Sequence, residues 1–154
     1  MSQARETADK VELTRWAYAS LNSRDFDALM DIFGPDSVWD VSRWGLGIHA
    51  GADAIRRFLG DWFETLDEYE VQIEEMLDLG NGVIYVEVLQ IARPAGSGYS
   101  LHLRSAPVFV WAAGVVARLT LYPDLAEARA AAERLAASRA SAMSRANVEV
   151  ASER

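Results

Sequence analysis

Asp40 is the residue in this sequence whose setting best suits acid or base chemistry. It lies between Trp39 and Val41, at the end of a short apolar segment. Apolar surroundings disfavour an ionised carboxylate, so we expect a raised pKa and a proton acceptor that works near neutral pH. Two structural alternatives stay open for this side chain: it caps a turn, or it pairs with Arg43 at the end of the strand.

Further polar residues fall on strand faces that the alternation of side chains assigns to the interior. Arg118 needs a partner there, because a buried unpaired arginine is costly. It either binds an anionic group of a ligand, pairs with Asp40 or another acid, or lies outward in solvent. A register shift of one residue would exchange it for Ala117 and Leu119. The candidate polar ligand contacts are Ser42, Gln90, Arg118, Thr120 and Tyr122.

Aromatic side chains suggest the kind of ligand. The chain has five tryptophans, five tyrosines and five phenylalanines, which are many large rings for one small core. Most of them pack against one another, and a minority that lines a cavity would suit a flat, apolar molecule held by shape and one or two polar contacts. The candidate ring contacts are Trp39, Trp44, Phe58 and Trp62.

Composition argues against several classes of function. The sequence has no cysteine, and its two histidines, His49 and His102, are far apart, so we expect neither a metal site nor a cofactor. A net charge of −8 is wrong for a nucleic-acid partner. No apolar run approaches the length of a membrane span, and the first residues lack the apolar segment of a secretory signal, which predicts a cytoplasmic protein.

Three segments rich in β-branched and aromatic residues predict an antiparallel meander. They are Val83–Ala92, Tyr99–Trp111 and Val115–Tyr122, and short turn sequences join them. Weak alternation over Tyr69–Leu79 predicts a fourth strand in the same sheet. Apolar groups occupy both faces of these strands. We therefore expect the outer face of the sheet to meet a second copy of the chain in a homodimer.

Helical patterns flank the meander. Asp9 can cap a helix that ends near Asn22, and Asp25 or Asp27 can start a short helix that stops at Gly34. The third begins at Ala52 or Asp53, and Asp124 can cap an alanine-rich helix over Leu125–Ser138. Between the second and third helices, Asp36–Ser42 predicts a brief strand, followed by a loop over Arg43–Gly51. This order predicts an α+β fold in one domain over residues 9–138, with flexible tails at 1–8 and 139–154.

The arrangement resembles the SnoaL-like, or polyketide cyclase-like, family of the nuclear transport factor 2-like superfamily. The likeness lies in Tyr18–Asp27 followed by Pro35–Asp40, in Gly51–Phe58, and in Gly114–Arg118 with Tyr122–Asp124. It implies a cone-shaped, curved antiparallel or mixed sheet, covered by three N-terminal helices around one deep pocket, with an extra C-terminal helix. It does not imply one activity, because members include isomerases, dehydratases, epoxide hydrolases, polyketide cyclases and non-catalytic binding modules.

The same resemblance bears on the site residues. Asp40 falls on the aspartate that serves as general base in the ketosteroid isomerase relatives, whereas their catalytic tyrosine aligns with Ala17 and their second aspartate with Pro107. Without these two donors an enolate is poorly stabilised, so we do not expect steroid isomerase activity. Tyr18 matches a position common in SnoaL-like relatives and is a further candidate ligand contact.

Three functions therefore stay open. The first is a cofactor-independent isomerase, cyclase or hydrolase that acts on a small hydrophobic substrate, with Asp40 as base and Tyr18, Arg118 or Tyr122 orienting it. The second is a module that binds a small apolar ligand without turnover. The third is a dimeric scaffold whose pocket is filled by its own tryptophans. The resemblance to this family, rather than the residues themselves, narrowly favours the first function.

Overall fold

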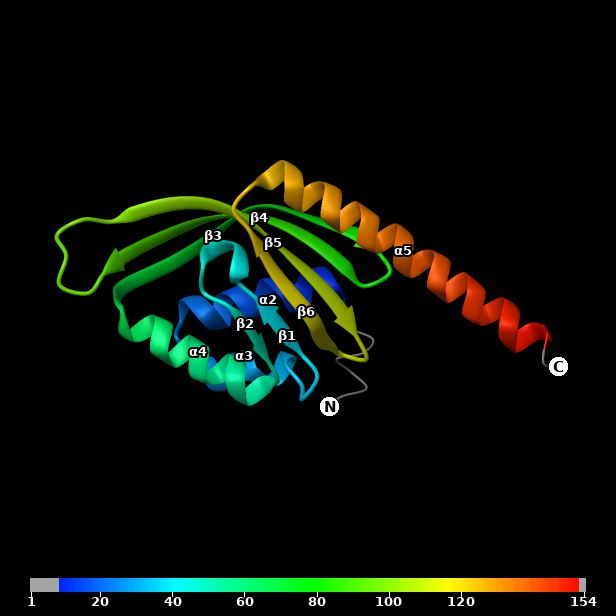
Figure 1. The fold of residues 1–154 in the computed structure, drawn as a ribbon. Coiled ribbons are helices and arrows are strands. Elements are labelled where there is room, and N and C mark those ends of the chain that lie inside the picture. Colours follow the sequence, from blue (N-terminus) through cyan, green and yellow to red (C-terminus); the bar gives the residue numbers. More distant parts are fainter. Residues whose placement is uncertain (1–8, 153–154) are drawn as a thin grey trace.

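A strongly curved sheet forms the body of the protein in the computed structural model, which describes residues 9–152, with side chains described as far as Arg145 (Figure 1). The strands in spatial order are β2 (Ile48–Ala50), β1 (Val38–Asp40), β6 (Val115–Tyr122), β5 (Leu101–Ala112), β4 (Val83–Pro94) and β3 (Leu66–Gly80). All neighbours pair antiparallel except β1 and β6, which pair parallel. The predicted mixed α+β fold is confirmed.

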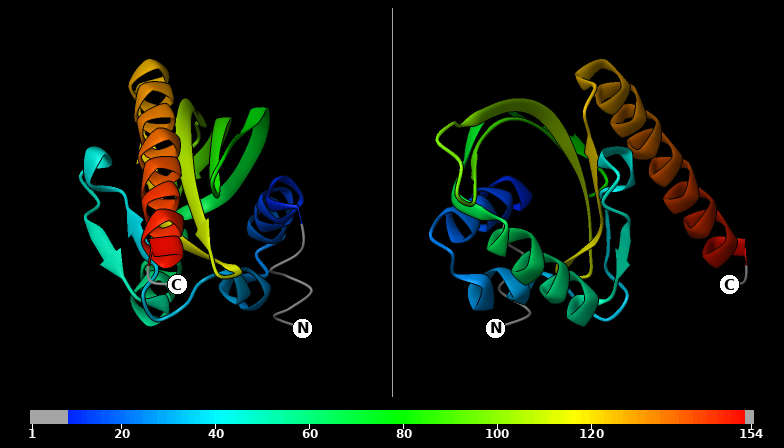
Figure 2. Two further views of the ribbon diagram at one scale, coloured as in Figure 1. Left: turned by 90° about the vertical axis from the view of Figure 1, so that its right-hand side faces the viewer. Right: turned by 60° about the vertical axis from the view of Figure 1, so that its left-hand side comes forward.

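Helices lie on both sides of this sheet. On its concave side are α2 (Lys10–Asn22), α3 (Phe26–Leu29) with the 3-10 turn Met30–Ile32, and α4 (Ala52–Glu64) (Figure 2). The long helix α5 (Leu125–Ser152) runs across the opposite side. It continues past Ser138, where the sequence predicted its end. No helix in the described part of the chain is both long and apolar enough to cross a membrane.

Aspartates start three of the helices, as the sequence predicted. The side chain of Asp9 accepts a hydrogen bond from the Val11 amide, and that of Asp25 accepts one from the Ala28 amide. Asp124 accepts one from the Glu127 amide at the start of α5. Each bond satisfies an amide that has no partner within its own helix, which fixes where the helix begins.

One strand was missed. The stretch predicted as a loop over Arg43–Gly51 contains β2, whose Ile48 and Ala50 pair with Asp40 and Val38 of β1. With only three residues and an exposed Ile48, β2 is too short for a recognisable alternation. The two strands form a hairpin, and the loop between them begins at Val41.

The sheet has an apolar core on each side. The inner core joins the concave face to α2, α3 and α4. In the outer core, small residues of α5 pack on the convex face; its buried members are Val83, Tyr85, Ala106, Val108, Val110, Tyr122, Ala128, Ala131, Ala132 and Ala136. Part of the outer face, which the sequence predicted to meet a second copy of the chain, is therefore covered by α5 of the same chain.

The inward face of β6 was also assigned wrongly. Leu119 and Leu121 point into the concave side, whereas Thr120 and Tyr122 lie on the side of α5. Both sets contain apolar groups, so alternation alone could not choose between them. A register irregularity between the pairs Val110–Arg118 and Trp111–Val116 brings Val116 back into the inner core.

Close packing of α5 on the sheet can be tested at Ala132, which is fully buried. We expect Ala132→Leu to lower the free energy of unfolding by about 1–3 kcal/mol, because no space is left for a larger side chain. Ala126→Leu, on the exposed side of the same helix, is the matched control and should be nearly neutral. Urea unfolding followed by circular dichroism measures both; equal stabilities would show that α5 does not pack as described.

Candidate functional site

Two adjoining cavities lie on the concave side of the sheet. The deeper has a volume of about 40 Å³ and the outer of about 170 Å³. Trp39, Trp62, Gln90 and Leu121 line both, so these residues form the boundary between them. None of the lining residues carries a charge. The space is therefore suited to an uncharged, largely apolar molecule.

Aromatic rings form much of the wall. Trp39 stacks on Phe33 with centroids 5.9 Å apart and meets the edge of Phe58 at 5.8 Å. Phe58 stacks on Trp62 at 6.1 Å, and Trp62 in turn contacts Tyr69 at 4.9 Å. The rings are thus fixed by one another, which keeps the wall in place without a ligand.

A short hydrogen-bonded chain is the main polar feature of the cavities. Ser105 donates to Oε1 of Gln90 at 3.3 Å, and Nε2 of Gln90 donates to the Tyr69 hydroxyl at 2.7 Å. Since Tyr69 accepts in this chain, its own proton is available for another acceptor. Sequence reasoning selected Gln90 but missed Tyr69 and Ser105. Side-chain alternation could have found both, because Tyr69 lies on the same strand face as Val71 and Ser105 on the same face as Pro107.

Both tyrosines in the deep cavity stay protonated at neutral pH. Burial raises the pKa of Tyr69 to about 12, although the hydrogen bond from Gln90 and the charge of Arg24 act in the opposite direction. Burial also raises the pKa of Tyr18 well above its usual value, and the nearby Tyr69 adds to this rise. The two phenols can donate hydrogen bonds but are poor bases.

Two indole nitrogens beside the outer cavity are buried without a hydrogen-bond partner among the described residues. They are Nε1 of Trp39 and Nε1 of Trp44. The indole of the fully buried Trp111, in contrast, donates to the Thr14 hydroxyl at 3.2 Å. A buried donor without a partner costs about 1–3 kcal/mol, so the position of both nitrogens is unfavourable as it stands.

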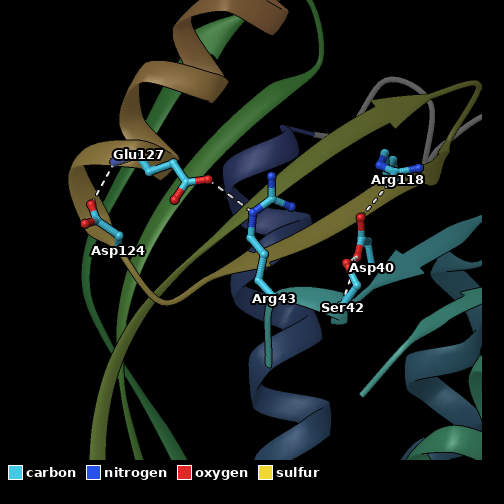
Figure 3. Close-up of polar contacts among 6 residues, drawn as sticks. All are labelled: Asp40, Ser42, Arg43, Arg118, Asp124 and Glu127. Atoms are coloured by element: carbon cyan, nitrogen blue, oxygen red, sulfur yellow. Dashed lines mark hydrogen bonds and ion pairs between the residues drawn. The ribbon is translucent and has the colours of Figure 1, made fainter. Parts of the chain in front are cut away.

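Asp40 lies on the other side of β1, away from the cavities. Its Oδ1 accepts hydrogen bonds from the Ser42 amide at 3.0 Å and the Ser42 hydroxyl at 2.5 Å (Figure 3). Its Oδ2 is 2.7 Å from Nη2 of Arg118. The Asp40 side chain is only 7% exposed, and that of Arg118 is 45% exposed. Both carboxylate oxygens therefore have partners.

The expected rise in the pKa of Asp40 was wrong. Burial does raise this pKa, but the hydrogen bonds from Ser42 and Arg118 and the charge of Arg118 outweigh it, so the pKa lies below its usual value. Of the alternatives left open by the sequence, the turn cap and the pair with Arg118 describe the geometry. Arg43 instead forms an ion pair with Glu127, at 3.2 Å.

The predicted site residues thus form two separate groups. Those that line the cavities are Tyr18, Trp39, Trp44, Phe58, Trp62 and Gln90. The others gather on the outer side, where Arg118 donates to the Thr120 hydroxyl at 3.3 Å and the Arg43 guanidinium lies 4.3 Å from the ring centre of Tyr122. Assigning Ser42, Arg118, Thr120 and Tyr122 to the inner face was therefore wrong. No cluster of His, Cys, Asp and Glu among the described residues could hold a metal ion.

Comparisons with solved structures agree on the fold. An NTF2-like protein of unknown function from Burkholderia pseudomallei is 21% identical, with a TM-score of 0.68 over 79% of this chain and 95% of that one. A putative SnoaL-like polyketide cyclase from Shewanella putrefaciens is 14% identical, with a TM-score of 0.64 over 75% and 90%. TerC, co-crystallised with polyporic acid, is 19% identical, with a TM-score of 0.65 over 80% and 98%.

Sequence comparison gives the family. No curated protein matches the sequence closely enough to suggest a function. The profile of the SnoaL-like domain matches residues 14–119, which contain all six strands apart from the last residues of β6 and every predicted site residue that lines the cavities. This match shows that the chain belongs to the SnoaL-like domain family, and the solved structures show that its curved sheet has the NTF2-like fold.

Proposed function

We propose that the protein binds a small, uncharged aromatic or alicyclic molecule that carries an oxygen acceptor, such as a ketone. The observation that carries this proposal is the composition of the cavity wall, which combines aromatic rings and neutral hydrogen-bond donors with no charged side chain. A charged ligand would leave water without meeting a counter-charge, which is unfavourable. A ligand with no acceptor would leave the donors unpaired.

The donors suit an acceptor that enters from the outer cavity. Tyr69 keeps its proton while accepting from Gln90, and the indoles of Trp39 and Trp44 lack partners. The rings of Phe58 and Trp62 supply a flat apolar surface beside them. The co-crystal of TerC with polyporic acid supports a small molecule as the kind of ligand in this fold.

A pair of ligands that differ in one oxygen tests the proposal. We expect α-tetralone to bind about fivefold more tightly than tetralin, because one net hydrogen bond contributes roughly 1 kcal/mol. Tyr69→Phe should reduce this ratio, since it removes one hydroxyl from a wall that otherwise keeps its shape. Fluorescence titration, with tryptophans in the cavity wall as the signal, measures both affinities.

Phe58→Leu is the control for that experiment. It removes ring surface but no donor, so it should weaken the binding of both ligands and leave their ratio near that of the original protein. If neither ligand binds the unaltered protein at its solubility limit, the proposed function is wrong. If both bind equally, the cavity takes apolar ligands but does not select an acceptor.

Catalysis with Asp40 as general base remains a second candidate. Its support is the relation of the family to polyketide cyclases. The partners of the Asp40 carboxylate argue against it, because a base must reach a proton of its substrate and both oxygens are already bonded. We therefore favour binding as the function and treat Asp40 first as a structural residue.

The pH dependence of stability tests this structural role. Because the pKa of Asp40 is lowered in the folded state, its stabilisation is present above the ordinary value of 3.8 and is lost as the pH falls through the folded-state pKa. We expect Asp40→Asn to lower the free energy of unfolding at pH 7 by about 1–2 kcal/mol. This free energy should then decrease less in acid than it does in the unaltered protein. Asp27→Asn, at an ion-paired side chain that is 94% exposed, is the control and should change little. If the free energy of unfolding falls in acid by the same amount in the Asp40 variant and in the unaltered protein, the structural role of Asp40 is contradicted.

We also propose a homodimer, which the convex face of the sheet supports. Beside α5 a groove of about 340 Å³ stays open over β5 and β6, with Val108, Val110 and Leu135 among its lining residues. A second copy seated in this groove would cover the part of the convex face that α5 leaves open. Sedimentation equilibrium should give twice the chain mass of 17.0 kDa; a mass of one chain at micromolar concentration would exclude a stable dimer.

A further inference from the structure

The loop that joins β1 to β2 closes one side of the outer cavity. This mouth loop comprises residues 41–47. The Val41 amide donates to the Gly47 carbonyl at 2.9 Å, while the amides of Trp44 and Leu46 both donate to the Val41 carbonyl. The side chains of Trp44 and Leu46 line the outer cavity. The loop is thus a compact unit with an apolar inner side.

Two other residues of the mouth loop point the opposite way and are bound there. Ser42 donates twice to Asp40, whose other oxygen meets Arg118 of β6. Arg43 reaches Glu127 in the first turn of α5, as Figure 3 shows, and covers the Tyr122 ring. Different residues of one short loop therefore serve two purposes: Ser42 and Arg43 attach it, and Trp44 and Leu46 form part of the cavity wall.

We propose that Asp40 and Arg43 are positioning residues that hold the mouth loop against the cavity, so that these outer contacts set how fast a ligand enters and leaves. The inference rests on the proposed ligand-binding function. Trp44 and Leu46 both line the outer cavity, so a displacement of the loop backbone would carry their side chains away from it. Loosening either contact on the outer side frees the inner wall.

The two contacts differ in strength. Asp40 is buried and has charged and neutral partners, so it holds the base of the loop firmly. The side chains of Arg43 and Glu127 are 38% and 52% exposed, and such pairs are weak in water. Arg43 is therefore the contact that releases first. Glu127 is in turn fixed by the Asp124 cap of α5, which makes the start of the C-terminal helix part of the control.

Glu127→Gln tests the weaker contact, and Glu133→Gln is its matched control. Glu133 forms a comparable exposed pair on the same helix, with Arg129 at 2.8 Å, but Arg129 is not in the mouth loop. Two quantities are measured: the hydrogen exchange of the amides of residues 41–47 without ligand, and the association and dissociation rates of α-tetralone by stopped-flow tryptophan fluorescence. The first needs no ligand and the second does.

We expect Glu127→Gln to speed exchange in residues 41–47 and to raise the dissociation rate of α-tetralone about two- to fivefold, the range for loss of a weak exposed pair. Exchange in β4 and β5 should not change, nor should either quantity in Glu133→Gln. The doubly reversed variant Arg43→Glu with Glu127→Arg restores an ion pair and should return both quantities toward those of the unaltered protein.

Several results would overturn the inference. Unchanged exchange in residues 41–47 shows that the Arg43 contact does not hold the loop, whether or not a ligand binds. Faster exchange with unchanged α-tetralone rates shows that the loop does not control access. Failure of the unaltered protein to bind α-tetralone contradicts the proposed function instead, and faster exchange would then still support the attachment of the loop by Arg43.

Discussion

The parallel pairing of β1 with β6 is the constraint on which the site depends. It aligns Trp39 with Leu119 and Asp40 with Thr120. Side chains alternate along both strands, so this register sends the tryptophan and the leucine to the concave side and the aspartate and the threonine to the convex side. A shift by one residue would exchange the two sets. It would place a carboxylate in the cavity, and the charge of Arg118 would lose its partner.

Solvation explains why the two sets are kept apart. The concave side is enclosed by helices and rings, where an ionised group would lose its water with nothing to replace it. The convex side near β1 is partly open, so Arg118 can stay half in solvent while it neutralises Asp40. The cavity keeps only groups that are polar without charge, namely phenols, indoles and one amide. Its selectivity then depends on hydrogen bonding and shape.

Local signals predicted much of the fold. Capping aspartates identified the starts of three helices, and apolar segments separated by short turns identified the meander, because these features depend on neighbours in sequence. The face of β6 and the strand β2 depend on contacts with distant segments. Alternation alone does not decide whether Leu119 or Thr120 faces inward; the packing of α5 on the side of Thr120 does. Ile48 belongs to a strand because it pairs with Asp40, a residue of another segment. The chain of Ser105, Gln90 and Tyr69 likewise joins three strands and has no trace in any one of them.

The turn between β3 and β4 fixes where α5 leaves the body. Asn81 donates to the Ala136 carbonyl, and Arg139 donates to the Asn81 carbonyl at 2.6 Å. Beyond these two hydrogen bonds the helix extends away from the sheet, as Figure 1 shows, and Met143 is 54% exposed. The end of α5 is therefore a suitable attachment point: a surface linkage, a spectroscopic tag or a fused domain placed there would lie far from the cavity and leave its wall undisturbed.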